Sequence, residues 1–405
     1  MPFVSALAFT GTISLPLIFA VFLFMLMILK IVQSGKLPDD LLGFDVVIIS
    51  IFLFFIIFSF VINGWGNSKS LNHTVGYLST FLLFYVAIKF TLFSFPEKNF
   101  LFRRVLQFIT YTTIISALYG NAEFITSNIF GINLNTYIPR PSEAEAYYDA
   151  TVLGLFYRAR GFAPESGHFT FMMELFSPLS IYYMYFSGFC KWRKLLKAFT
   201  VLLIILSIIF AVSSASFIII PLAVLSASVL YFKKIFLYIK RHLGKSVINI
   251  FIAIVIIFII NYFVSLYSLI VLSVSDKLDS FSFDDREERI NFFYDKFIYL
   301  DFIKKLSGTG PAGFDILGFD ESKSILSLYH SITFELGFLG LLLIILLFIY
   351  SILNTLQIKS KIGFFLLISI ISGVLHYYFI ANFWYPWLWF IIVFSVFCNK
   401  KLSNG

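Results

Sequence analysis

Charge is scarce in this chain. Only 13% of its 405 residues are charged, whereas 60% are hydrophobic and the mean hydropathy is +0.92. A soluble domain carries about 25% charged residues, so a soluble globule, a disordered tail and a nucleic-acid-binding domain are excluded. Two cysteines provide neither a disulfide framework nor a CxxC metal or redox site. With 22 glycines and 11 prolines, the chain is also not of low complexity. What is abundant is apolar side chains, 54 of them phenylalanine, and they predict an integral membrane protein.

Long apolar runs recur along the whole chain. A run of about 20 apolar residues is long enough to cross a bilayer as a helix. The runs do not alternate apolar with polar residues, which excludes a membrane β-barrel. We therefore expect residues 1–405 to form a single integral membrane domain, an all-α bundle of about eleven (10–12) spans, with the first run retained rather than cleaved as a signal peptide. The runs lie near 8–29, 41–62, 75–95, 104–125, 167–189, 195–213, 215–232, 246–271, 329–352, 362–380 and 382–398.

The basic residues give the expected orientation. With eleven spans, 18 of the 30 lysines and arginines fall on one side, accompanied by only three acidic residues. Lysine and arginine accumulate in cytoplasmic loops, so this side is predicted to be cytoplasmic and the N-terminus to lie outside. The net charge of +8 is therefore mainly an orientation signal.

Two long loops, 126–166 and 272–328, are expected on the outer face. Together they hold 15 of the 22 acidic residues and ten lysines or arginines. The chemistry of the chain should therefore be concentrated in these loops.

The first loop ends in a segment suited to binding an anion. Pro164 is typical of the first turn of a helix, and helix N-termini favour anions through free N–H groups and the helix dipole. Arg158 and Arg160, just before it, add forked donors that match phosphate oxygens. Alternatively, the arginines only pair with acidic residues of the same loop: Glu143, Glu145 or Asp149.

The same segment offers a candidate base. Glu165 and His168 are three residues apart and would share one face of a helix. A carboxylate or an imidazole at this position could take a proton from a substrate hydroxyl.

The second loop contains a predicted amphipathic helix. Asp284 and Glu287 have the spacing of a capping box, and apolar residues then recur with a helical period. We expect this helix to lie on or near the outer membrane surface. Arg286 and Arg289 would share one face of its first turn. They would either bind substrate or pair with neighbouring acids, and an ion pair at a surface contributes little to stability. The apolar positions are Ile290, Phe293, Phe297 and Leu300.

A glycine-rich stretch, 307–314, follows this helix. No Lys-Ser or Lys-Thr comes after it, so it is not a nucleotide P-loop, and it reads as a turn returning the chain to the membrane. His330 then opens the ninth expected span, where it can take or give a proton. The alternative is an ordinary polar group at the interface. Asp284 and Asp285 alternate with arginines, and no metal motif is predicted.

Charges inside the expected spans are functional candidates because they are costly in lipid. Asp45, Lys89 and Glu174 lie within spans, and Glu123 lies near the end of one. Pairing of Lys89 with Asp45 or Glu174 would be a structural explanation. His376 lies near the outer end of the expected span 362–380. The tryptophans close to it suggest an aromatic belt at the membrane interface: Trp384, Trp387 and Trp389.

Two stretches of the chain resemble the O-antigen polymerase (Wzy-type) and O-antigen ligase superfamily. Residues 160–166, Arg-Gly-Phe-Ala-Pro-Glu-Ser, look like its arginine–glycine–acidic stretch. Gly308-Thr309-Gly310, followed by Tyr329-His330-Ser331 and by residues 335–340, looks like its second signature. The resemblance covers roughly residues 150–350 and the hydropathy profile, and it implies a fold like that of the superfamily's GT-C-like glycosyltransferases.

Three departures from the family pattern bear on the activity. The usual Glu-Pro order is inverted at Pro164-Glu165, and Ser331 replaces the expected Asn. Ligases tend to place an Arg after a Ser near the outer end of the sixth or seventh span, whereas residues 212–216 here read Val-Ser-Ser-Ala-Ser. This last departure favours polymerase over ligase.

The resemblance implies a nucleotide-independent membrane glycosyltransferase without metal or other cofactor. It would transfer a glycan from polyprenyl pyrophosphate to a second lipid-linked repeat unit at the periplasmic face of a bacterial inner membrane. Glu165 or His330 would be the base. Substrate would be bound by a cationic set: Arg158, Arg160, Arg286, Arg289 and His168.

The expected partners are the lipid-linked oligosaccharides and the bilayer, with a chain-length regulator protein as a further candidate, and no nucleic acid. The alternatives are an O-antigen ligase, which would use a lipid A–core acceptor, and a flippase for lipid-linked oligosaccharides. A flippase predicts repeated halves and cationic residues deep in the bundle, whereas the polar residues here gather in two loops.

Overall fold

The computed structural model describes residues 15–35, 37–38, 41–134, 151–152, 156–242, 281–317 and 325–403. The expected span at 246–271 lies outside them, as do the acids of the first loop, Glu143, Glu145 and Asp149. The described part is almost entirely helical, so the predicted all-α fold class is confirmed.

The described residues up to the end of α7 form a two-stranded sheet and nine helical elements. They are α1 (Leu15–Ser34), α2 (Phe44–Ser59), η1 (Phe60–Gly64), α3 (Ser68–Phe81), η2 (Leu82–Val86), α4 (Ala87–Ser94), α5 (Lys98–Ile129), β1 (Thr151–Val152), β2 (Phe156–Tyr157), α6 (Ser166–Tyr185) and α7 (Lys194–Phe210). η1 and η2 are single π-helical turns that continue α2 and α3. β1 and β2 are antiparallel, with Thr151 opposite Tyr157.

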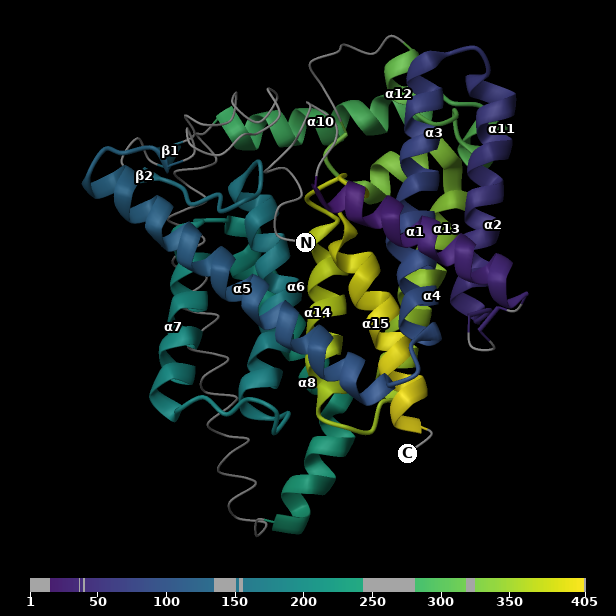
Figure 1. Cartoon of the computed structure of the whole chain (residues 1–405). Coiled ribbons are helices and arrows are strands. Elements are labelled where there is room, and N and C mark those ends of the chain that lie inside the picture. The colour runs from purple at the N-terminus through teal and green to yellow at the C-terminus, as the bar shows by residue number, and fades with distance from the viewer. Residues whose placement is uncertain are drawn as a thin grey trace.

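The second half contains α8 (Ser214–His242), α10 (Phe281–Ile298), α11 (Phe302–Ser307), α12 (Gly313–Ile316), α13 (Leu328–Gln357), α14 (Ile362–His376) and α15 (Pro386–Ser403). Figure 1 shows most of the helices running roughly along one direction, with α10 lying across one end of the bundle. α10 belongs to the second of the two long loops expected from the sequence.

Within the described residues, five helical segments are long and apolar enough to cross a membrane, which agrees with an α-helical membrane protein. They are Pro16–Ser34, Phe44–Gly64, Ser68–Ser94, Ser214–Tyr231 and Leu328–Gln357. The other expected spans within the described residues coincide with α5, α6, α7, α14 and α15. The number of eleven spans stays a prediction.

The connections rich in basic residues share one end of the bundle. In Figure 1 the α6–α7 connection, the α13–α14 connection and the end of α15 lie at the lower end, opposite α10 and the small sheet. Which side of a membrane this end faces stays a prediction.

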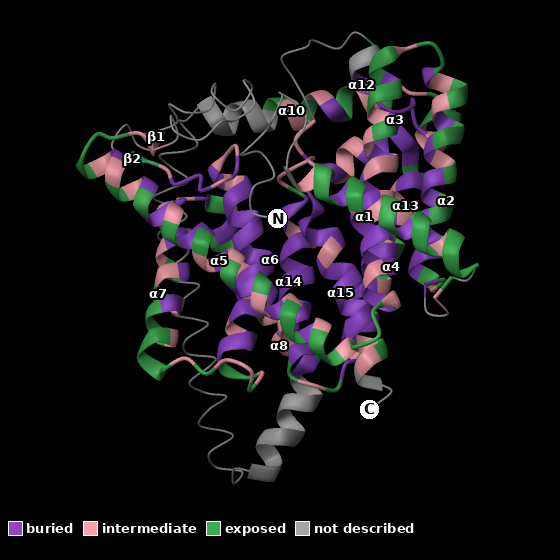
Figure 2. Ribbon diagram, in the orientation of Figure 1, coloured by how far each residue is buried: buried purple, intermediate pink, exposed green. Residues whose placement is uncertain are grey.

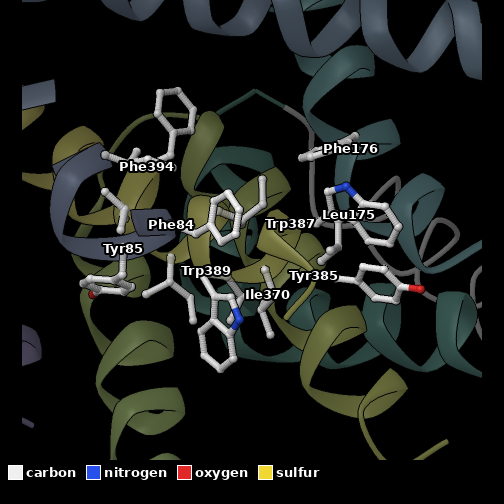
Figure 3. Close-up of a cluster of buried hydrophobic side chains, with 14 of the residues drawn as sticks. Phe84, Tyr85, Leu175, Phe176, Ile370, Tyr385, Trp387, Trp389 and Phe394 are labelled. Atoms are coloured by element: carbon white, nitrogen blue, oxygen red, sulfur yellow. The ribbon is translucent and has the colours of Figure 1, made fainter. Parts of the chain in front are cut away.

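The core lies where α6, α14 and α15 pack together, as the buried residues of Figure 2 show. Trp387 and Trp389 are fully buried there and lie among other large apolar side chains (Figure 3). The expected aromatic belt is therefore wrong for these two tryptophans, and of the three expected in the belt only Trp384 is exposed. An apolar stretch such as 384–389 is compatible with a protein environment and with a lipid environment, so its hydropathy does not tell which of them surrounds the tryptophans.

A buried ion pair joins α2 to the helix that follows η2. Lys89 Nζ lies 2.8 Å from Asp45 Oδ2, and the Tyr85 hydroxyl donates to the same carboxylate over 2.7 Å. All three residues are fully buried. Lys89 thus pairs with Asp45 rather than with Glu174, and the pair has a structural explanation.

Candidate functional site

The segment that carries the first candidate residues, 156–164, is fastened to α5. The Asn128 side chain bonds both backbone groups of Tyr157: it accepts from the N–H over 2.8 Å and donates to the carbonyl over 3.0 Å. Ala159 N–H donates to the carbonyl of Phe210, at the end of α7. These bonds hold the segment between α5 and α7 although it has no helical structure of its own.

Glu123 on α5 fixes the turn at Arg160. Its Oε2 accepts the backbone N–H of Arg160 over 2.8 Å and that of Gly161 over 2.7 Å, and its Oε1 lies 3.8 Å from Arg160 Nε. Both charged side chains are buried. Arg160 therefore pairs with an acidic residue, as the alternative interpretation proposed. The acid is Glu123 on α5, however, and not a residue of the same loop. Arg160 holds the loop rather than pointing freely toward a substrate.

The N-terminus of α6 lies directly after this turn. Glu165 is the residue before the helix, with extended backbone, and its side chain makes no capping hydrogen bond to the helix. Pro164 therefore precedes the helix, and its expected place in the first turn is wrong. Arg158 and Glu165 are both half-buried. They lie on either side of the turn fixed by Glu123, and Glu165 directly precedes the first turn of α6.

His168 lies in the first turn of α6 and is buried. Its ring is 4.9 Å from that of Tyr385, in an edge-to-face arrangement. Among the described residues, its Nδ1 has no hydrogen-bond partner. Its position beside Glu165 agrees with the spacing in the sequence, but the imidazole points into the protein.

Further along α6, Glu174 contacts His376 at the end of α14. Glu174 Oε2 lies 2.8 Å from His376 Nδ1, and both side chains are buried. A carboxylate that accepts from Nδ1 fixes the imidazole tautomer and leaves Nε2 able to take a proton. The sequence marks both residues, but nothing in it pairs two positions that are 202 residues apart.

His330 lies at the start of α13 under α10. Its ring is 4.6 Å from Phe293 and 6.0 Å from Tyr378. Arg289 is half-buried and lies one turn before Phe293 on α10. Arg286 is a further turn away, and its side chain lies outside the described part. α10 thus brings an arginine to the helix face that covers His330.

One expectation about α10 is wrong, and one stays a prediction. The helix is already formed at Phe281, so Asp284 lies inside it and does not open it with a capping box. The expected apolar stripe packs on protein, and the position of the helix on or near the outer membrane surface stays a prediction. Phe293 is buried, and Phe297 and Leu300 join it in an aromatic cluster against α12 and α13 that includes Phe314 and Phe334. A helix face buried in lipid and one buried against protein show the same helical period of apolar residues.

The glycine-rich stretch crosses α13 at a break in that helix. Thr309 N–H donates to the carbonyl of Phe334 over 3.0 Å, and Gly310 N–H to that of Glu335 over 2.9 Å. Gly337 interrupts α13 with φ 66° and ψ −171°, and Gly308 has φ 81°. A Cβ at Gly308 would collide with the backbone of Glu335, and one at Gly337 with that of Leu306. The two glycines therefore allow the two chain segments to touch.

Glu335 at this crossing bonds α3. The Tyr77 hydroxyl donates to Glu335 Oε2 over 2.9 Å, and His73 Nδ1 lies 3.3 Å from Oε1. This carboxylate is buried and ties α13 to α3, a role that the sequence alone did not indicate.

The connection between α14 and α15 joins the two groups of candidates. Its first residue, Tyr377, accepts the N–H of Leu328 at the start of α13. Tyr378 lies next to His330, and Tyr385, at the far end, lies next to His168. The connection therefore contacts the second resembling stretch at His330 and contacts α6 two residues after the first stretch ends.

Within the part of the chain that the structure describes, no group of three or more His, Cys, Asp or Glu side chains is arranged to hold a metal ion. The absence of a metal or other cofactor stays a prediction.

Comparison of the chain with protein-family models, with curated proteins and with solved structures finds no match. The functional assignment therefore rests on the residues of this chain and on their geometry.

Proposed function

We propose that the protein is a membrane glycosyltransferase of the O-antigen polymerase type. It transfers a glycan from polyprenyl pyrophosphate to the sugar hydroxyl of a second lipid-linked repeat unit, at the periplasmic face of the bacterial inner membrane. The observation that supports this proposal best is that one connection, 377–385, contacts His330 of the second resembling stretch and also His168, two residues after the first. Tyr385 lies beside His168, and Tyr378 beside His330.

The leaving group of this reaction is a lipid pyrophosphate, which gains negative charge as its bond to the sugar breaks. Arg158 and Arg289 are its proposed ligands, together with the N–H groups at the start of α6. A hydrogen bond to a charged group contributes about 1.5–3 kcal/mol, and more when it is aimed at charge that forms in the transition state. Arg160 supports them from its place on Glu123.

The acceptor hydroxyl must lose its proton to a base as the new glycosidic bond forms. Glu165 and His330 are the proposed candidates, because both are half-buried at the end of the bundle where α10 lies. A positioned base typically contributes about 10²–10⁴-fold in rate. His376 has a carboxylate partner that orients it, but it is fully buried, so we assign it to support of α6 against α14.

The proposal is tested by replacing Arg158, Arg289 or Glu165 with alanine in a strain that depends on this chain for its surface polysaccharide. The variants should leave single repeat units on the lipopolysaccharide core and no long chains. Glu97→Ala changes an exposed acid at the other end of α5 and should keep wild-type chain length. Long chains at wild-type abundance in inserted variants would remove the replaced residue from the mechanism.

Loss of the whole protein separates polymerase from ligase. A strain without a polymerase still attaches one repeat unit to the core, whereas a strain without a ligase attaches none and accumulates lipid-linked polymer. A flippase is distinguished because its loss leaves the repeat units on the cytoplasmic side. We expect the first result, because residues 212–216 lack the arginine that ligases tend to have.

A further inference from the structure

A row of large apolar side chains is exposed where α10 ends and α11 begins. Tyr299 is 88% exposed, Phe302 74%, Ile303 73% and Ile298 61%. They lie away from the aromatic cluster that packs α10 on α13, since Phe293 in that cluster is buried. Four adjacent apolar side chains at such exposure are unusual on a surface that faces water.

This row continues the lipid-facing surface of α13. The first turns of α13 are covered by protein, and its exposed apolar face begins at Phe338 and Leu339. Phe297, near the end of α10, packs edge-on against Phe338 with ring centroids 5.5 Å apart. α13 is one of the five segments apolar enough to cross a membrane. The end of α10 therefore lies at the level where the lipid-facing part of that segment begins.

The turn that presents the row is locally fixed and is followed by two lysines. Asp301 caps α11 by accepting the N–H of Lys304 over 2.8 Å. Lys305 Nζ donates to the carbonyl of Ile298 over 2.7 Å, which closes the turn. Tyrosine beside lysine is typical of the membrane interface, where rings enter the apolar layer and ammonium groups stay among the headgroups.

We propose that residues 298–305 form an interfacial anchor. Tyr299, Phe302 and Ile303 insert into the edge of the hydrocarbon layer. Lys304, whose Nζ lies 3.9 Å from Asp301 Oδ2, stays among the anionic headgroups, while Lys305 holds the turn. The anchor holds α10 across the end of the bundle and keeps the α10 surface that carries Arg289 close to the bilayer. This inference is independent of the proposed glycosyl transfer.

The test uses spin labels at single cysteines in the full-length protein, reconstituted in vesicles of phosphatidylcholine and phosphatidylglycerol. Cys190 is replaced by Ser, while Cys398 is buried and is kept. Labels are placed by Tyr299→Cys and Ile303→Cys, with Leu339→Cys as the control for lipid and Glu288→Cys as the control for water. Glu288 is exposed on the same helix as the anchor's start. Accessibility to oxygen, which concentrates in lipid, is compared with accessibility to a water-soluble nickel complex.

The proposal predicts that labels at 299 and 303 behave as the label at 339 does, with oxygen accessibility above nickel accessibility. The label at 288 should show the reverse. Because the labelled side chains are exposed, labelling leaves the packed face of α10 unchanged. A pattern at 299 and 303 like that at 288 would overturn the proposal. Low accessibility to both reagents would also overturn it, because protein would then cover the row.

Discussion

The turn at Arg160 should depend on a single carboxylate. Glu123 accepts two backbone N–H groups, those of Arg160 and Gly161, and also faces the Arg160 guanidinium. A hydrogen bond to a charged group contributes about 1.5–3 kcal/mol, so the two N–H bonds together hold the turn by roughly 3–6 kcal/mol. Glu123→Ala removes both acceptors and leaves a buried arginine without this partner.

Because about 1.4 kcal/mol corresponds to a tenfold change in an equilibrium constant, opening of the turn should become more frequent by about 10²–10⁴-fold. Hydrogen–deuterium exchange of a peptide covering residues 156–165 measures this opening directly. Glu123→Gln keeps one oxygen that can accept both N–H groups but places an amide beside Arg160, so its exchange should be intermediate. The helices on either side should keep their slow exchange.

Glu97→Ala is the matched control, since Glu97 is an exposed acid just before the same helix, and it should leave exchange at 156–165 unchanged. Wild-type exchange in Glu123→Ala would refute the reasoning, because the turn would then be held by other contacts. The activity of Glu123→Ala should fall together with its loop protection.

Three further substitutions test the packing. Lys89→Met should lower the free energy of unfolding by about 3–5 kcal/mol, because the buried carboxylate of Asp45 loses its cation. Adding Asp45→Asn should recover part of this loss, as measured by thermal melting. Gly308→Ala should reduce folded yield on size exclusion, since its Cβ meets the backbone of Glu335, whereas Gly167→Ala, with open space around it, should not. Trp389→Ala should cost about 3–5 kcal/mol in thermal unfolding, and a negligible loss would contradict its place in the core.

The hydropathy pattern predicted the helices better than their surroundings. Apolar runs near 41–62 and 329–352 became α2 with η1 and α13 because a helix satisfies every backbone group in an apolar setting. The same pattern misplaced Trp387 and Trp389, since a side chain facing lipid and one facing protein are equally apolar.

The candidate site was predicted in part. Sequence reasoning selected the segment around Glu165 and the start of α13 at His330, because polar residues are rare and gather there. It missed the use of Glu123 as the acceptor for the turn at Arg160 and the pairing of Glu174 with His376. Such pairs are set by how distant helices pack, and local spacing carries no information on that.

The central claim is that this protein transfers a glycan from a lipid pyrophosphate. The most direct measurement is incubation of the purified protein in lipid with a chemically defined polyprenyl-pyrophosphate repeat unit, without added metal or nucleotide, followed by separation of the products by length. The account predicts a ladder of products that differ by one repeat unit and that disappears in Glu165→Ala. No elongation of a verified substrate by the folded wild-type protein would contradict it.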